Sequence, residues 1–194
     1  KAGVEMLNDP RIKAGSFTGS IRVGRMLADI AAARPTPIPF YGELGSVNPV
    51  FVTEAALHDN AEGILDGFIT SVSGSAGQLC TKPGFLFAPA GVSLESGIAS
   101  RVSAVAEHRL LNPGITSGYE ARRNAVLSTP GVTVLAEGDL RIDDDGQGWA
   151  TPTVVSVPLT VLKEHRAELL DESFGPLSIV VEYEVDETGG DSVA

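Results

Sequence analysis

Cysteine is almost absent from this chain, which has a single thiol, Cys80, among 194 residues. One cysteine cannot form an internal disulfide, so the disulfide-stapled class of secreted domains is excluded and a reducing cytoplasm is favoured. Long apolar runs are missing too, since none approaches the roughly 18 residues of a membrane-spanning helix, and no signal peptide is recognisable. The sequence therefore predicts a soluble, cytoplasmic protein with no membrane partner.

Basic residues are also scarce. Lysine and arginine number 14 against 25 aspartates and glutamates, which gives a net charge of −11. No basic cluster offsets this charge, so neither nucleic acid nor an anionic membrane surface is expected as a partner. The acidic run Asp143-Asp144-Asp145-Gly146 has the composition of a solvated hairpin tip, and its spacing is not that of a calcium-binding EF-hand loop.

Apolar residues are plentiful, at 43% of the chain against 20% charged, which is enough to fold around a sizeable core. The length suits one domain, or one domain plus a fragment. Stretches with helical periodicity alternate with short apolar runs rich in Val, Ile and Phe. This alternation predicts an α/β fold with a largely parallel sheet flanked by helices. We expect no linker between domains and no internal repeat.

Periodicity and turn residues place the individual elements. Helices are predicted over 21–33, 53–74, 94–111, 117–128 and 160–170. Strands are predicted over 11–17, 38–44, 48–52, 85–88, 132–136, 149–159 and 177–185. Ser20 and Thr53 are expected to cap the first two helices. The acidic, glycine-rich tail 186–194 is expected to fray.

The segment 77–84 carries Cys80 on a turn bounded by glycine and proline, between a long helix and the apolar run 85–88. Nucleophilic cysteines are presented at clefts on such turns, although a lone cysteine is more often a small buried hydrophobe. A second feature favours chemistry. Glu43 lies between Gly42 and Gly45 in an otherwise apolar segment, which offers a carboxylate as a partner for the thiol.

A thiol and a carboxylate can take part together in two kinds of catalytic mechanism. A hydrolase of the papain type needs a histidine base, but His58, His108 and His165 all fall in stretches expected to be helical and solvated. In the other scheme a thiolate adds to an aldehyde, a nicotinamide cofactor takes the hydride, and a carboxylate activates water to release the thioester. The order strand, glycine turn and helix around Gly19 could hold a phosphate of that cofactor.

Four short motifs extend this interpretation. They are Phe17-Thr18-Gly19-Ser20, Gly42-Glu43-Leu44-Gly45, Gly77-Gln78-x-Cys80 and Glu172-x-Phe174-Gly175-Pro176. In this order and at about this spacing they resemble the aldehyde dehydrogenase superfamily, over residues 11–185. The sequence of residues 38–49 resembles that of one branch of the superfamily, which holds 2,5-dioxovalerate (α-ketoglutarate semialdehyde) dehydrogenases and a bacterial NADP-dependent fatty aldehyde dehydrogenase.

The resemblance implies a catalytic domain of the aldehyde dehydrogenase type, with Cys80 as the nucleophile and Glu43 as the general base for the deacylating water. It implies NAD or NADP as cofactor. The implied cofactor-binding residues are Gly19, Ser20, Leu44, Glu172 and Phe174. Of these, Ser20 would face the pyrophosphate, Glu172 the nicotinamide ribose and Phe174 the nicotinamide ring.

Members of the superfamily are more than twice as long as this chain. Residues 1–40 are therefore expected to form the end of a nucleotide-binding domain, and residues 41–194 an incomplete catalytic domain. The resemblance implies a small-molecule aldehyde, such as a semialdehyde, as the substrate. It also implies a homo-oligomeric parent enzyme, no metal, and a fragment that is inactive by itself.

Two alternatives stay open at this point. One is a cysteine-dependent acyl-transfer or hydrolase domain without nucleotide, which requires a histidine base within hydrogen-bond reach of Cys80. The other is a non-catalytic α/β interaction module, in which the thiol is buried and inert.

Overall fold

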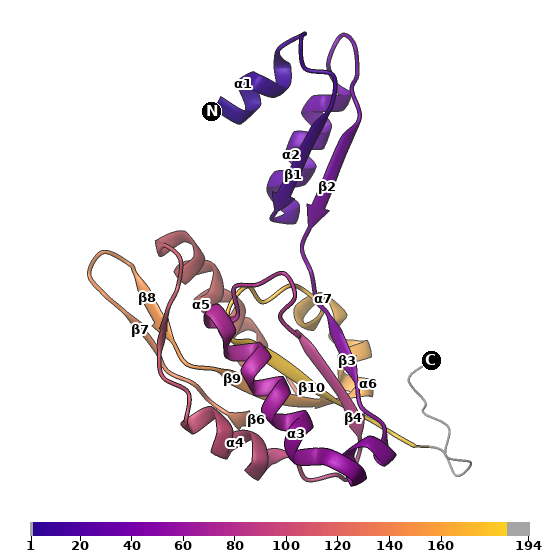
Figure 1. The fold of residues 1–194 in the computed structure, drawn as a ribbon, viewed down its shortest axis with the longest axis vertical. Helices are drawn as coiled ribbons and strands as arrows, with labels where there is room; N and C mark the ends of the chain where they lie inside the picture. Colours follow the sequence, from indigo (N-terminus) through magenta and orange to yellow (C-terminus); the bar gives the residue numbers. More distant parts are fainter. Residues whose placement is uncertain (1, 186–194) are drawn as a thin grey trace. The chain divides into compact units, whose positions relative to one another are not determined.

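A computed structural model of the chain describes residues 2–185, so the expectation for the tail 186–194 lies outside the described residues. The chain forms two compact units, one ending at Ser46 and the other starting at Val47 (Figure 1). The division predicted after residue 40 falls inside the strand Phe40–Leu44, which belongs to the first unit. The functions assigned to the two parts of the chain stay predictions.

The first unit contains α1 (Ala2–Asn8), β1 (Gly15–Gly19), α2 (Ile21–Ala32) and β2 (Phe40–Leu44). β1 and β2 are parallel, with Gly19 opposite Leu44. Leu7, Ala31 and Ile38 form the buried centre of this unit. Parallel strands end at the same edge of a sheet, so the chain leaves both strands on one side, next to the start of α2.

The second unit is built on a main sheet with strands from distant parts of the chain. The strand order is β3 (Pro49–Phe51), β4 (Phe85–Pro89), β10 (Leu177–Tyr183), β9 (Thr153–Pro158) and β6 (Thr133–Ala136). Only β6 pairs antiparallel to its neighbour among the strands of this sheet in the described residues. The predicted α/β fold with a largely parallel sheet is confirmed.

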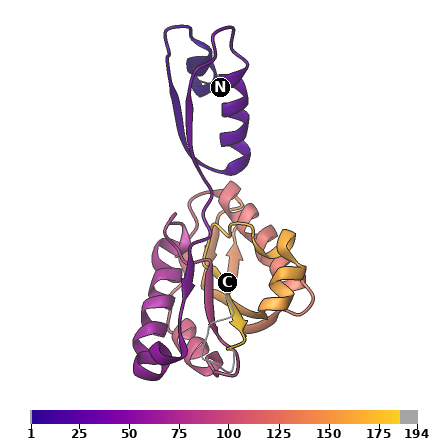
Figure 2. The same ribbon diagram turned by 90° about the vertical axis from the view of Figure 1, so that its right-hand side faces the viewer.

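Alternating side chains of the main sheet enter two cores, as the two-residue period of a strand requires. On β10, Val180 enters one core, while Ile179 and Val181 enter the other. The first core lies under α3 (Glu54–Ser73) and α4 (Glu95–Ser103). The second lies under α5 (Pro113–Ser128), α6 (Leu159–Glu164) and α7 (Arg166–Leu169). Figure 2 shows the sheet between these two layers of helices.

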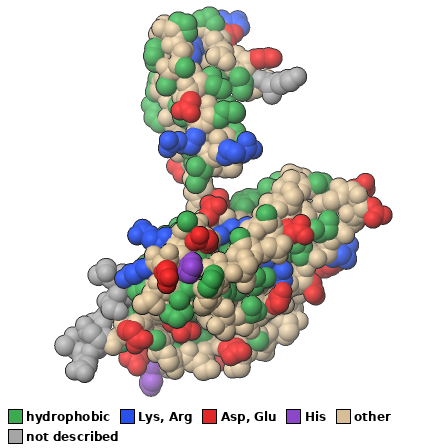
Figure 3. All heavy atoms as spheres, turned by 180° about the vertical axis from the view of Figure 1, so that it is seen from behind, with side chains coloured by type: hydrophobic (Ala, Val, Ile, Leu, Met, Phe, Trp, Pro, Cys, Tyr) green, Lys and Arg blue, Asp and Glu red, His purple; other side chains and the backbone are tan. Residues whose placement is uncertain are grey.

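A smaller antiparallel sheet joins β5 (His108–Arg109), β8 (Gly148–Ala150) and β7 (Leu140–Ile142). The predicted hairpin tip at 143–146 connects its last two strands, as expected. Over the face that Figure 3 shows, acidic and basic side chains of the second unit are interspersed rather than gathered into one patch.

Several predicted boundaries were wrong. The helix predicted over 94–111 ends at Ser103, and His108 lies on β5 because the amide of Leu110 donates to the carbonyl of Gly148 at 2.9 Å. The strand predicted over 149–159 divides into β8 and β9, and the helix predicted over 160–170 into α6 and α7. Helix α1 was not predicted. No helix in the described part of the chain is long and apolar enough to cross a membrane.

Candidate active site

The cysteine lies three residues after a strained turn. Helix α3 leads into a 3-10 turn, η1 (Gly74–Gly77), in which Ser75, Ala76 and Gly77 have φ values of 50°, 54° and 65°. Left-handed backbone at two consecutive non-glycine residues costs of order 1–3 kcal/mol at each, and such strain gathers at functional sites. The Cys80 side chain is exposed, so the expectation of a presented thiol is met and that of a small buried hydrophobe is not.

Gln78 fixes the shape of this turn. Its amide nitrogen donates to the carbonyl of Ser75 at 2.9 Å, and its amide oxygen accepts from the backbone N–H of Leu111 at 2.7 Å. One side chain thereby ties the strained residues to the segment that follows β5. We infer that Gln78 holds the turn in place against the relaxation that its strain would favour.

Asn48 holds the other side of the turn. Its Nδ2 donates to the carbonyl oxygens of Cys80 at 2.5 Å and of Lys82 at 3.0 Å. Asn48 itself has φ of 38°, a conformation that asparagine tolerates better than most residues. Sequence reasoning gave this residue no role, and the left-handed preference of asparagine is the one signal that could have pointed to it.

The Cys80 turn (residues 77–84) touches the Glu172 loop (residues 171–176). A Cβ atom on Gly77 would lie 2.4 Å from the carbonyl oxygen of Gly175, so the two backbones meet where no side chain fits. The structure therefore brings together two of the four motifs, Gly77-Gln78-x-Cys80 and Glu172-x-Phe174-Gly175-Pro176. Glu172 and Phe174 are both half-buried.

Arg122, on α5, organises the Glu172 loop. Its guanidinium donates to Ser173 Oγ at 3.0 Å and to the carbonyl oxygens of Leu169 and Asp171, both at 2.8 Å, as well as to that of Glu168. Burial lowers the pKa of this arginine, while the carboxylate of Asp171 opposes the shift. The planar guanidinium presents several N–H donors at once, which suits such a set of carbonyl acceptors. Sequence reasoning did not identify this role of Arg122.

Lys82 is a buried cation in the Cys80 turn, 6% exposed, and its Nζ donates to the carbonyl oxygen of Leu177 at 2.7 Å. Burial lowers its pKa to about 8, while the Glu172 carboxylate opposes the shift and the charge of Arg122 adds to it. Sequence reasoning assigned no role to this residue.

We expect Lys82 to make stability depend on pH. Because its ordinary pKa is 10.5 and its pKa in the fold is about 8, the unfolded chain holds more protons between these values. The free energy of unfolding should therefore rise with pH across this window, by up to about 3 kcal/mol. Urea unfolding at a series of pH values checks this, and Lys82→Met should remove the rise.

The exposed Lys163 provides the control for this prediction, because Lys163→Met should leave the rise unchanged. Tyr119 acts in the opposite direction only above its ordinary pKa of 10, since burial raises its pKa to about 12. Measurements between about pH 7.5 and 9.5 therefore isolate the lysine. A flat profile in the unsubstituted chain would contradict the prediction.

The remaining candidate residues lie in the first unit. Ser20 caps α2, as predicted, because its Oγ accepts from the backbone N–H of Val23 at 3.4 Å. Gly19 precedes it at the end of β1, and Glu43 and Leu44 end β2 at the same edge of the sheet. Glu43 is exposed and Leu44 is half-buried. Glu43 and Cys80 belong to different units, and their pairing across one cleft stays a prediction.

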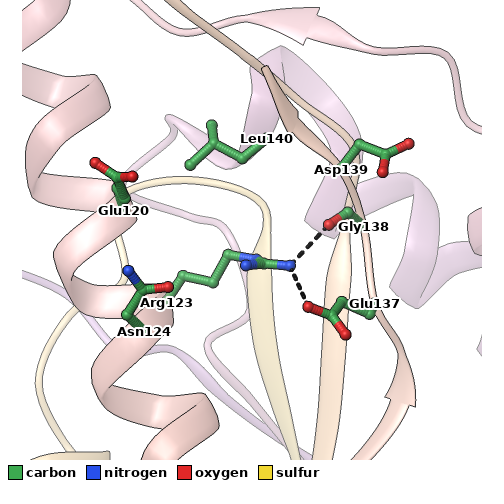
Figure 4. A pocket seen from close by; sticks show the side chains of 7 residues that line it. All are labelled: Glu120, Arg123, Asn124, Glu137, Gly138, Asp139 and Leu140. Atoms are coloured by element: carbon green, nitrogen blue, oxygen red, sulfur yellow. Dashed lines mark hydrogen bonds and ion pairs between the residues drawn. The ribbon is translucent and has the colours of Figure 1, made fainter. Parts of the chain in front are cut away.

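A separate hollow of about 410 Å³ lies between α5 and the connection from β6 to β7, lined by Glu120, Arg123, Asn124, Glu137, Gly138, Asp139 and Leu140 (Figure 4). Arg123 reaches across it and donates to Glu137 at 2.8 Å and to the carbonyl of Gly138 at 2.9 Å. None of the predicted site residues lines it. These bonds fasten the connection to α5, which is a structural role.

Together, fold and turn define a class: an α/β domain that exposes its single thiol just after a strained turn, in contact with a loop that carries a carboxylate and an aromatic ring. Residues 1–189 match the model of the aldehyde dehydrogenase family, and the chain belongs to that family. The family resemblance drawn from the four motifs is confirmed.

Relatives and solved structures agree with this assignment. The chain is 32% identical over 184 residues to an alpha-ketoglutaric semialdehyde dehydrogenase of Acinetobacter baylyi, covering 93% of the chain and 34% of that protein. It is 33% identical over 182 residues to alpha-ketoglutaric semialdehyde dehydrogenase 2 of Azospirillum brasilense, with coverages of 92% and 34%. The chain thus spans about a third of the length of these relatives.

Among solved structures, a mutant of aldehyde dehydrogenase C from Pseudomonas syringae, complexed with NAD+ and octanal, has a TM-score of 0.78 at 23% identity. It matches over 95% of this chain and 39% of its own. A proline utilization A mutant from Bradyrhizobium japonicum has a TM-score of 0.77 at 22% identity, over 94% and 19%. At these identities the likeness shows the shared fold.

Proposed function

We propose that the parent protein oxidises an aldehyde to a carboxylic acid with NAD or NADP, and that Cys80 is its nucleophile. The observation that carries the proposal is the contact of Gly77 with Gly175, which joins the strained turn before the exposed thiol to the loop of Glu172 and Phe174. A thiol buried as packing would need neither the strain nor this contact. Family membership supports the same reading.

The residues present fit a nicotinamide cofactor. Helix α2 has twelve residues, Ser20 at its N-cap and no acidic residue in its first turn, so its free N–H groups and dipole favour an anion. We assign the pyrophosphate to Gly19 and Ser20, with Leu44 beside the cofactor at the neighbouring strand end. Glu172 and Phe174 would meet the nicotinamide ribose and ring.

In the proposed reaction the Cys80 thiolate adds to the carbonyl carbon, and the resulting oxyanion is held by donors that include the backbone N–H of Cys80. NAD or NADP, when bound, would accept the hydride that leaves the former carbonyl carbon, so that the adduct on Cys80 becomes a thioester. Glu43 then takes a proton from water, whose oxygen attacks the thioester carbon. The carboxylic acid leaves, and the thiol is restored.

For substrate class we propose a semialdehyde, since two relatives above 30% identity are named alpha-ketoglutaric semialdehyde dehydrogenases. We assign the unit up to Ser46 to the end of a nucleotide-binding domain and the unit from Val47 to the catalytic domain. A homo-oligomeric parent and a cytoplasmic location complete the proposal, the latter because a reactive thiol needs a reducing compartment.

The test compares the parent enzyme with the isolated 194-residue chain. The parent should form reduced cofactor with 2,5-dioxovalerate, and its kcat/KM should exceed that for the neutral aldehyde pentanal by at least about tenfold, the worth of one charge-assisted hydrogen bond. The isolated chain should form none, because it spans only about a third of the length of these relatives.

Two results would count against the proposal. A parent enzyme that oxidises no aldehyde with either cofactor would overturn the assigned activity. Steady turnover by the isolated chain would refute its inactivity and leave the activity itself standing.

A further inference from the structure

Lys82 belongs to two parts of the candidate active site at once. Its main chain is part of the Cys80 turn, because its N–H donates to the carbonyl of Leu79 at 3.0 Å and its carbonyl accepts from Asn48. Its side chain leaves the turn and ends on Leu177, the first residue of β10 and the residue directly after the Glu172 loop. Lys82 thus links the Cys80 turn to the first residue of β10, directly after the Glu172 loop.

The site holds this cation at a cost. Burying an ammonium group is unfavourable unless it is paired and hydrogen-bonded, and an apolar side chain of the same length would fill the space without that penalty. The groups that act on the charge of Lys82 are the Glu172 carboxylate, which favours it, and the Arg122 guanidinium on α5, which opposes it. The Glu172 carboxylate of the neighbouring loop therefore stabilises the charged form of Lys82.

We propose that Lys82 is a positioning residue that fastens the Cys80 turn to the first residue of β10, where the Glu172 loop ends, and orients the Glu172 carboxylate by its charge. The inference rests on the proposed function in one respect, the role of Glu172 toward the cofactor. When Lys82 loses its proton, the hydrogen bond to Leu177 becomes a neutral one and the attraction to Glu172 disappears. The geometry of the cofactor side of the site then depends on the protonation of a residue two positions from the thiol.

The first experiment measures the coupling in the chain as it exists. The chain has four lysines, Lys1, Lys13, Lys82 and Lys163, so carbon-13 labelling of the lysine Cε atoms gives few NMR signals to follow with pH. One signal should titrate with a midpoint near pH 8, and it should vanish in both Lys82→Met and Lys82→Arg. Should Lys82→Met fail to fold, Lys82→Arg and the unsubstituted chain still identify the signal.

Glu172→Gln should move this midpoint to lower pH by about half a pH unit or more, because the carboxylate that favours the charged lysine is gone. The matched control is Asp171→Asn, since Asp171 acts on Arg122 rather than on Lys82. An unchanged midpoint in Glu172→Gln, or an equal shift in Asp171→Asn, would overturn the proposal whatever the parent enzyme catalyses.

The second experiment uses the parent enzyme and separates positioning from folding. Lys82→Met should raise KM for the cofactor roughly tenfold, the equivalent of one charge-assisted hydrogen bond, and leave KM for the aldehyde nearly unchanged. Lys82→Arg should restore part of the loss, whereas Lys163→Met should change neither constant. A general structural defect would raise both KM values together, and that result contradicts a positioning role. Failure of the proposed activity would show as no turnover by the unsubstituted parent.

Discussion

Glu43→Gln in the parent enzyme is expected to give at most about one equivalent of reduced cofactor per active site and then to slow by about 10²–10⁴-fold, the usual cost of removing a general base. Glutamine keeps the volume of the side chain but cannot take a proton from water. If Glu43 acts on the deacylating water, the thioester on Cys80 forms once and is then trapped.

Rapid mixing with detection of reduced cofactor measures the burst, and intact-mass spectrometry of the quenched protein should show the acyl group on Cys80. Cys80→Ala should give neither burst nor adduct, because no thiohemiacetal can form. Glu164→Gln, at the exposed end of α6, provides the matched control and should keep the full steady rate.

Two outcomes would contradict the assignment of Cys80 as the nucleophile and Glu43 as the base for the deacylating water alone. An unimpaired steady state in Glu43→Gln would remove Glu43 as the base. Loss of the burst itself would mean that Glu43 also activates the thiol, so that the two steps share one carboxylate. Because Cys80 and Glu43 come from different units of the chain, this experiment also tests whether the two residues serve one site.

Local sequence signals predicted much of the fold. Ser20 and Thr53 cap α2 and α3 as expected. The buried residues of α3, which recur at helical spacing, are Leu57, Leu65, Phe68, Ile69 and Val72. The errors arose where distant pairing decides the structure. The apolar spacing continues past Ser103, but the chain there pairs with β8, some forty residues further on, and long-range pairing of this kind leaves no local pattern.

The candidate site divides in the same way. Cys80, Glu172 and Phe174 were predicted as site residues because they lie in short motifs, whereas Lys82 and Arg122 were not predicted. Both basic residues bind main-chain carbonyl oxygens. Lys82 binds that of Leu177, and Arg122 binds those of Glu168, Leu169 and Asp171. Every residue type presents a carbonyl, so such partners cannot be recognised from a sequence. The residues that hold the motifs in place are therefore visible only in the fold.

Gly77→Ala is expected to lower the free energy of unfolding by roughly 2–5 kcal/mol, the sum of a left-handed backbone penalty and an overpacking penalty. Gly77 has φ of 65°, and the new Cβ would lie 2.4 Å from the carbonyl oxygen of Gly175 and 2.7 Å from the nitrogen of Pro176. Both are backbone atoms and cannot rotate away. Relief therefore requires the Cys80 turn and the Glu172 loop to separate.

Gly67→Ala is the matched control, because Gly67 is exposed within α3 and a Cβ there would meet nothing within 4 Å. Alanine should stabilise this helix position by about 0.5–1 kcal/mol, so the two substitutions have opposite expected signs. Urea unfolding of both variants at one pH gives the comparison, and the iodoacetamide reaction rate of Cys80 should change in Gly77→Ala alone. Equal unfolding midpoints for Gly77→Ala and the unsubstituted chain would show that the two loops do not meet as described. The proposed active site would then lose the observation that supports it, the contact between Gly77 and Gly175.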